Sequence, residues 1–203
     1  MEHEEIEVKY HVDDPPGLRQ RLAAAGAVSS GRVFEKNIRF EDAGNSLIRQ
    51  KALLRLRQDN RNVLTFKQAL DKGDNQFKIY REIETEVGDF EATGRILESL
   101  GYFPCQVYEK YRETFLVPGA VICLDTMPYG DFLEIEADKG LIRELTDRLG
   151  LDWNKRILAT YLGLFEHVRK AACLPFTDLT FDNFRNVRFD FTAIWKRFEQ
   201  GEG

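Results

Sequence analysis

Cysteine and histidine are scarce in this chain of 203 residues, which contains three of each. The cysteines are odd in number, widely spaced and without a Cys-x-x-Cys pair, which argues against a disulfide framework or a thiolate zinc site. The histidines are equally dispersed, so they offer no cluster that could hold a metal ion. These scattered residues are Cys105, Cys123, Cys173, His3, His11 and His167.

Long apolar runs and an excess of positive charge are also missing. No run of apolar residues is long enough to span a bilayer, and the acidic N-terminus lacks the apolar segment of a secretory signal. The net charge of −5 gives no general attraction to nucleic acid or to an anionic membrane. We therefore expect a reduced, cytoplasmic protein with neither a membrane nor a nucleic-acid partner.

Alternating and periodic segments divide the chain into about eight strands and several helices. The expected strands lie at 5–12, 32–41, 52–58, 62–69, 77–87, 103–116, 121–127 and 130–137. The expected helices lie at 13–27, 89–101, 141–151 and 156–171. Turn-like stretches, among them 41–46 and 58–62, separate several of these segments. This order favours an α+β fold with a largely antiparallel sheet.

Each expected strand has one apolar face and one charged face, because successive side chains of a strand point to opposite sides. Leu54 and Leu56, for example, alternate with Arg55 and Arg57. For any single strand, the simplest explanation is an open sheet whose charged face meets water. Taken together, however, the charged faces combine clustered Arg and Lys with clustered Glu, whereas a solvent face would also use Thr, Ser and Gln.

Eight antiparallel strands can close into a barrel, and apolar faces turned outward under helices would leave the charged faces inside. Enclosed charges are costly unless they are paired, hydrated or bound to a ligand. A highly anionic ligand with Mg²⁺ or Mn²⁺ would use both signs, since Arg and Lys hold phosphate oxygens and carboxylates hold the cation. We therefore predict an eight-stranded antiparallel β-barrel with a charged interior and helices packed outside.

The order of the charged residues resembles that of the CYTH superfamily, the triphosphate tunnel metalloenzymes. Residues 5–9 match the ExExK signature of that superfamily. The later motifs are LLRLR at 53–57, TFK at 65–67, REIETE at 81–86, EKYR at 109–112, LD at 124–125, FLEIE at 132–136 and ATYLGLF at 159–165. The resemblance covers about residues 2–168 and implies a tunnel open to solvent, a divalent-metal requirement and a nucleotide or inorganic triphosphate substrate.

Residue chemistry then suggests a role for each charged position. The side chains expected to hold a triphosphate are Lys9, Arg55, Arg57, Lys67, Lys110 and Arg112. The expected ligands of Mg²⁺ or Mn²⁺ are Glu5, Glu7, Glu134 and Glu136, with Glu82, Glu84 and Asp125 as further candidates. The residues expected to act in catalysis are Glu5, Glu7, Lys9, Lys67 and Arg112. No Ser, Cys or His constellation suggests a covalent intermediate, so direct in-line attack is the simpler hypothesis.

Three functions fit such a lining. Hydrolysis of inorganic tripolyphosphate, or of a nucleoside or other organic triphosphate, is favoured because it requires only the polar lining. The alternative is a class IV adenylyl cyclase, which converts ATP to cyclic AMP and pyrophosphate. A non-catalytic polyphosphate- or nucleotide-binding module would retain the basic residues and lose the carboxylates, which are intact here. The expected partner is a small-molecule triphosphate, and a homodimer is left open.

The sequence also predicts a division between residues 1–170, the tunnel domain, and residues 171–203. The second part is too rich in aromatic residues for a disordered linker, and we expect it to pack on the barrel or on a partner subunit. Tyr161, in the last predicted helix, could serve in helix packing or in ligand contact. The acidic position after Phe40 is ambiguous, because Glu41 and Asp42 both follow it.

Overall fold

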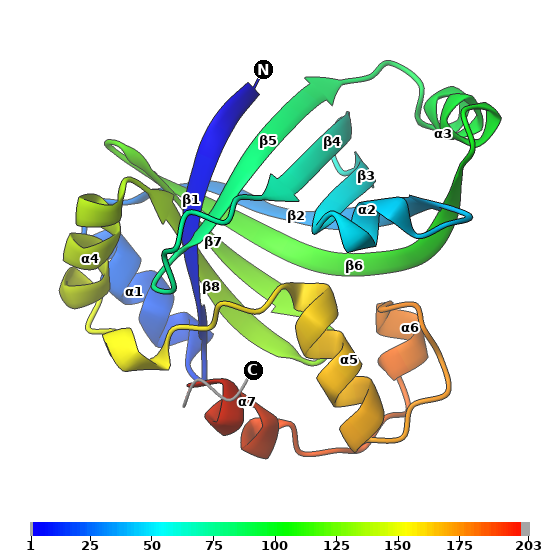
Figure 1. The fold of residues 1–203 in the computed structure, drawn as a ribbon. Helices are drawn as coiled ribbons and strands as arrows, with labels where there is room; N and C mark the ends of the chain where they lie inside the picture. The colour runs from blue at the N-terminus through cyan, green and yellow to red at the C-terminus, as the bar shows by residue number, and fades with distance from the viewer. Residues whose placement is uncertain (1, 200–203) are drawn as a thin grey trace.

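The computed structural model describes residues 2–199, and its centre is one closed barrel of eight antiparallel strands (Figure 1). The strands are β1 (Glu2–His11), β2 (Val28–Asp42), β3 (Ala52–Gln58), β4 (Asn62–Ala69), β5 (Lys78–Glu86), β6 (Tyr102–Val117), β7 (Ala120–Met127) and β8 (Gly130–Ala137). Around the barrel the order is β1-β5-β4-β3-β2-β6-β7-β8, and β8 pairs with β1 to close it. The predicted α+β barrel is confirmed.

Helices surround this barrel on several sides (Figure 1). They are α1 (Pro15–Ala24), α2 (Ser46–Arg49), α3 (Phe90–Ser99), α4 (Lys139–Arg148), α5 (Tyr161–Ala171), α6 (Phe181–Phe184) and α7 (Thr192–Glu199), with a 3-10 turn at Trp153–Lys155. Short polar side chains begin several of them; Asp89, for example, accepts a hydrogen bond from the amide of Ala92 at 2.8 Å. None of the helices within residues 2–199 is long and apolar enough to cross a membrane.

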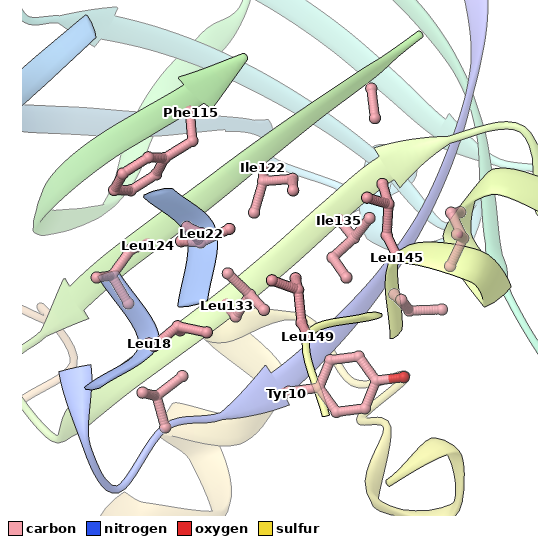
Figure 2. Packing of buried hydrophobic residues seen from close by; sticks show 14 of the residues in the cluster. Tyr10, Leu18, Leu22, Phe115, Ile122, Leu124, Leu133, Ile135, Leu145 and Leu149 are labelled. Atoms are coloured by element: carbon pink, nitrogen blue, oxygen red, sulfur yellow. The ribbon is translucent and has the colours of Figure 1, made fainter. Parts of the chain in front are cut away.

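The apolar faces of β1, β7 and β8 point outward and are covered by α1 and α4. Figure 2 shows Leu22 of α1 and Leu145 of α4 packed over Leu124, Leu133 and Ile135. Each of these five side chains is at most 2% exposed. A smaller cluster forms under α3 from Phe40, Leu56, Phe90 and Leu97. Because the apolar faces are used outside, the charged faces of the same strands line the interior, as the alternation predicted.

Residues 41–46, predicted as a turn, lead directly into the short helix α2. One carboxylate oxygen of Glu41 accepts from the amide of Leu47 and the other accepts from that of Ile48, both at 3.0 Å. Asp42 accepts from the amide of Ser46, also at 3.0 Å. Both acidic side chains therefore accept hydrogen bonds from amides at the start of α2, so Glu41 and Asp42 each have a structural role.

The last predicted helix, 156–171, is shorter in the structure than expected. Its first residues are extended, because the amide of Ile157 donates to the carbonyl of Lys9 at 2.7 Å and thereby attaches the chain to β1. The helix begins only at Tyr161, where the hydroxyl of Thr160 accepts from the amide of Gly163 at 3.0 Å. The hydrophobic periodicity of residues 156–171 could not reveal that the helix begins at Tyr161, because the hydrogen bond that keeps Ile157 extended is made with the distant Lys9.

The aromatic residues after position 174 pack against α5 and against the turn that joins β7 to β8. Trp195 of α7 is 3% exposed, and its ring lies edge-on to Phe132 with centroids 5.3 Å apart. Phe184 of α6 packs on Phe165 of α5 at 6.0 Å. This aromatic cluster places α5, α6 and α7 together at one end of the barrel (Figure 1).

The packing beneath α1 and α4 predicts a large stability loss for Leu133→Ala. Leu133 is fully buried, so truncation should leave a cavity and lower the free energy of unfolding by about 2–5 kcal/mol. Ile96→Ala on the exposed side of α3 is the control and should change it by less than about 0.5 kcal/mol. Chemical denaturation measures both, and equal effects of the two substitutions would contradict the packing described here.

Candidate functional site

The interior of the barrel is lined by charged side chains from all eight strands. On β1 the odd-numbered residues Glu5, Glu7 and Lys9 face inward, while Val8 packs in the outer core. The same alternation places all the predicted site residues of the other strands on this inner surface. The structure thus brings residues together from positions 5 to 136, and most of them belong to one of two groups of ion pairs.

The first, which we call the basic group, is a connected chain of ion pairs from β1, β2, β3, β6, β7 and β8. Its members are Lys9, Arg57, Lys110, Arg112, Glu35, Asp125 and Glu134. Arg112 donates two hydrogen bonds, of 2.7 and 2.5 Å, to the carboxylate of Asp125, and its guanidinium also lies 2.5 Å from the carboxylate of Glu134. Asp59, at the end of β3, also pairs with Arg57 at 3.1 Å, so four cations meet four carboxylates and the group has no net charge when all are ionised.

The second, the acidic group, contains Glu5, Glu7, Glu82, Glu136, Lys67 and Lys78. Lys78 contacts Glu7 at 2.6 Å, and Lys67 contacts Glu5 directly and Glu82 at 3.3 Å. Four carboxylates against two ammonium groups leave a net charge of −2 when all are ionised. Three of the four predicted metal ligands therefore lie together, whereas Glu134 is paired with cations of the basic group.

The acidic group carries more negative charge than its two lysines balance. The pKa of Glu5 is raised to about 8, chiefly by burial and also by the carboxylates of Glu7, Glu82 and Glu136, against the opposing effect of Lys67. Burial and the same neighbouring carboxylates also raise the pKa of Glu136. In the metal-free protein, Glu5 therefore holds a proton at neutral pH.

Other carboxylates of the lining are held ionised by adjacent cations. Burial opposes ionisation of Glu7, but Lys78, Lys67 and Lys9 together outweigh it and lower the pKa of Glu7 to about 2. Burial likewise opposes ionisation of Glu35, whose pKa falls to about 2 because of Lys110, Arg112 and Arg57. These two carboxylates keep their charge across the physiological range.

Arg55 is within electrostatic reach of both groups, because its charge helps to lower the pKa of Glu35 in the first and of Glu82 in the second. Its guanidinium donates to Thr65 at 3.1 Å and to the hydroxyl of Tyr108 at 3.4 Å, and it lies 3.9 Å from Glu84. The hydroxyl of Thr65 in turn donates to Glu84 at 3.1 Å. Glu84 is therefore placed beside the guanidinium of Arg55.

One inward-facing polar side chain has no partner within the described part of the chain. Asn37 is completely buried, and neither the oxygen nor the nitrogen of its amide makes a hydrogen bond. It lies across the strands from Arg57 and Tyr108, inside the barrel. A buried amide without a partner costs about 1–3 kcal/mol, so this group is available to hydrogen-bond a bound ligand.

Several lining residues were missed in the sequence prediction. Lys78 shares the strand face of Glu82, and Glu35 lies directly across from Lys110, so counting alternate residues along β5 and β2 would have found both. Asn37 follows Glu35 on the same face of β2. Cys123 also faces inward, and burial raises the pKa of its thiol to about 11, which leaves it as an uncharged wall residue.

The acidic group has the chemistry of a divalent-cation site. Within residues 2–199, no three Asp, Glu, His or Cys side chains already converge in a geometry that could hold a metal ion. The carboxylates instead contact Lys67 and Lys78. Carboxylate oxygens are nevertheless the ligands that Mg²⁺ and Mn²⁺ prefer, and a divalent cation would neutralise the charge of −2 that the group carries once Glu5 is ionised. Glu5, Glu7 and Glu136 therefore fit such a cation once the lysines turn away.

Solved structures with the same fold include proteins of archaeal, bacterial and plant origin. PH1012 from Pyrococcus horikoshii is 27% identical, with a TM-score of 0.67 over 77% of this chain and 96% of its own. A Vibrio parahaemolyticus protein, named provisionally as an adenylate cyclase, is 21% identical, with a TM-score of 0.67 over 77% of this chain and 94% of its own. HpAC1 from Hippeastrum, for which a dominant triphosphatase activity is described, is 18% identical, with a TM-score of 0.56 over 81% of this chain and 96% of its own.

The last two of these similarities show the fold alone, and no match is found among curated proteins. The family comparison is more decisive, because the model of the CYTH domain matches residues 3–155. That region contains all eight strands and both charged groups of the interior. From the matched domain and the barrel it forms, we conclude that the chain belongs to the CYTH family.

Proposed function

We propose that the protein hydrolyses a triphosphate inside the barrel with the help of Mg²⁺ or Mn²⁺. The observation that carries this proposal is that four cations, Lys9, Arg57, Lys110 and Arg112, are gathered beside a group in which four carboxylates outnumber two lysines, within one interior. The first suits phosphate oxygens and the second suits a divalent cation. Enzymes of the CYTH family are metal-dependent and act on small triphosphate substrates, which supports both assignments.

Binding would exchange the partners of the lining residues. In the structure Lys67 and Lys78 contact carboxylates of the acidic group. Both ammonium groups could turn to phosphate oxygens, and this exchange would release Glu5, Glu7 and Glu136 to hold the cation. Glu7 is already ionised at neutral pH, whereas Glu5 must first lose a proton.

The guanidinium of Arg112 would stabilise charge on the phosphate chain during cleavage. Asp125 and Glu134 hold Arg112 in a fixed direction, so little reorganisation is needed when the negative charge develops. The cation, when bound, would neutralise phosphate charge and polarise the phosphorus–oxygen bond that breaks. Lys9, Lys67 and Lys110 would share the remaining charge of the substrate.

The direct test is a product assay on the purified protein with Mg²⁺ or Mn²⁺, in which tripolyphosphate, ATP and thiamine triphosphate are offered separately. Release of orthophosphate is the expected result, and the fastest of the three reactions identifies the preferred substrate. Formation of cyclic AMP and pyrophosphate from ATP would replace the proposal with a cyclase. Tight binding without turnover of any of the three would identify a binding module.

Glu7→Gln should abolish metal-dependent turnover, since the neutral amide removes a charged ligand of the cation. We expect the rate to fall by roughly 100-fold or more, as for other ligands of catalytic metals. Glu4→Gln on the same strand is the matched control, because Glu4 faces outward and pairs with Lys72. Steady-state kinetics measure both variants, and a Glu7→Gln rate equal to that of the control would remove Glu7 from the site.

Lys67→Ala should weaken substrate binding and also slow turnover, because a point charge that holds phosphate oxygens is lost. An increase of KM of about tenfold is expected for one such contact. Lys36→Ala, which removes an exposed lysine from β2, is the control for the change in net charge. Unchanged kinetics in Lys67→Ala at low ionic strength would argue against its role.

Metal binding should strengthen as the pH rises toward 8. The folded, metal-free protein holds a proton on Glu5, whose pKa is raised from 4.5 to about 8. The stability that Glu5 contributes is therefore present below its unfolded pKa and is lost as the pH rises through about 8, while a cation that replaces the proton restores it.

The increase in melting temperature caused by Mg²⁺ should accordingly be larger at about pH 8.5 than at about pH 6.5. Glu5→Gln carries no titrating group at this position and should show a flatter dependence on pH. Thermal melting at fixed Mg²⁺ concentration measures the effect, and an identical increase at both pH values in the wild-type protein would contradict the assignment.

A further inference from the structure

One row of inward-facing side chains changes from charged to apolar along its length. It begins with Glu7 of β1, which lies opposite Glu136 of β8. From Glu136 the row continues to Val121 of β7, then to Leu116 of β6 and to Val28 of β2. Residues directly opposite each other in a β-ladder have their side chains on the same face of the sheet. Val121, Leu116 and Val28, which we call the apolar row, therefore face the interior beside the acidic group.

A β-bulge turns Val28 toward this inner face. The register of β2 against β6 shifts by one residue between Ser29 and Arg32, where Gly31 has a φ of +93°. Arg32 lies over the ring of Tyr111 on the outer surface. In a regular strand Val28 would share that outer face, because the two positions are an even number of residues apart. The bulge reverses the alternation, which is how bulges re-aim side chains beside functional sites.

The apolar row is accessible to solvent, in contrast to the carboxylates that begin the same row. Val28 is 69% exposed and Leu116 is 51% exposed, whereas Glu7 is 6% exposed. A single exposed aliphatic residue is common on protein surfaces and needs no explanation. Here, however, two of them are cross-strand neighbours on the face that carries both charged groups. Adjacent exposed apolar side chains of this kind indicate a binding surface.

The position of the apolar row suits the organic part of a triphosphate ester. Neighbouring strands lie about 4.8 Å apart, so Leu116, two strands from Glu136, is roughly 10 Å away from it. A phosphate chain held through a cation at Glu136 would therefore place an attached group within reach of Leu116 and Val28.

The chemistry of these side chains limits what they can bind. Val28, Leu116 and Val121 offer neither charge nor a hydrogen bond, so they contribute affinity only by covering apolar surface. The flat face of a nucleobase or of another aromatic ring fits such a row. Inorganic tripolyphosphate has no apolar surface to cover, and the apolar row would add nothing to its affinity.

From these observations we infer that the apolar row binds the organic group of the substrate, and that the protein acts on triphosphate esters that carry an aromatic ring. This inference rests on the proposed function and adds a substrate class to it. The apolar row contacts the ring and determines specificity, while the charged lining holds the phosphates and the cation.

The test compares two analogues that share a phosphate chain and differ in the organic group. Both have imido groups in place of the bridging oxygens of the chain, so that neither is cleaved; one carries adenosine and the other is the inorganic chain alone. Isothermal titration calorimetry with Mg²⁺ gives the dissociation constant of each. For Leu116→Ser we expect the adenosine analogue to bind about fivefold or more weakly, whereas the inorganic analogue stays within about twofold of its wild-type value.

Two further variants control for the substitution itself. Ile96→Ser changes an aliphatic residue of α3 that is 59% exposed on the outside, and it should alter the affinity of neither analogue. Leu116→Met retains an apolar side chain and should retain the affinity for the adenosine analogue. Thermal melting establishes that each variant is folded, and Val28→Ser replaces Leu116→Ser if that variant unfolds. Equal losses for both analogues, or no loss for either, would overturn the inference.

Failure of the proposed function gives a different result. If neither analogue binds to the wild-type protein in the presence of Mg²⁺, the barrel does not bind triphosphates, and both proposals fall together. If the inorganic analogue binds and the adenosine analogue does not, only the substrate class is overturned. The binding readout is independent of which bond the protein cleaves.

Discussion

The ion pair between Lys9 and Glu134, whose Nζ and Oε1 atoms lie 2.7 Å apart, shows the constraint on which the rest of the structure depends. Charges that are enclosed by the barrel must find partners inside it. Removing charges from water is expensive, and loss of one partner from a buried pair costs about 3–5 kcal/mol because the other remains unpaired. The apolar faces of the strands are used by the outer helices, so the lining cannot simply be replaced by a hydrophobic core. The interior is therefore held by networks in which each residue supports several others.

The ratio of cations to carboxylates differs between the two groups, and this difference gives their carboxylates different pKa values. Lys110, Arg112 and Arg57 lower the pKa of the buried Glu35 to about 2, whereas burial and neighbouring carboxylates raise the pKa of Glu5 to about 8 despite Lys67. Both carboxylates are buried, so the cations around each one decide whether it is ionised at neutral pH. A buried carboxylate without enough neighbouring cations destabilises the unliganded protein. The same carboxylate is useful in a site that receives a cation and a polyanion together.

Much of this arrangement could be predicted from sequence, because strand alternation fixes which side chains share a face. The existence and order of the strands and the inward direction of Glu7 or Arg112 follow from local pattern and motif order, although β1 and β2 begin three and four residues before their predicted starts. The contacts of Tyr161 could not be predicted, since its hydroxyl meets Asp125 only after the chain has folded back over 36 positions. The same holds for the extended start of the last helix, which depends on Lys9, and for Trp195, whose packing on Phe132 has no local signal.

Closure of the barrel by β1 also has a consequence for folding. The pair formed by Lys9 and Glu134 joins positions 125 residues apart, whereas β6, β7 and β8 are joined by short connections. Contacts of such large sequence separation form slowly, because the entropy of closing a long loop must be overcome before they contribute. β1 carries Glu5, Glu7 and Lys9, so the long-range pairing of β1 with β8 is also the step that adds these side chains to the charged lining. A chain in which β1 has not paired would consequently have most of its sheet without a complete site.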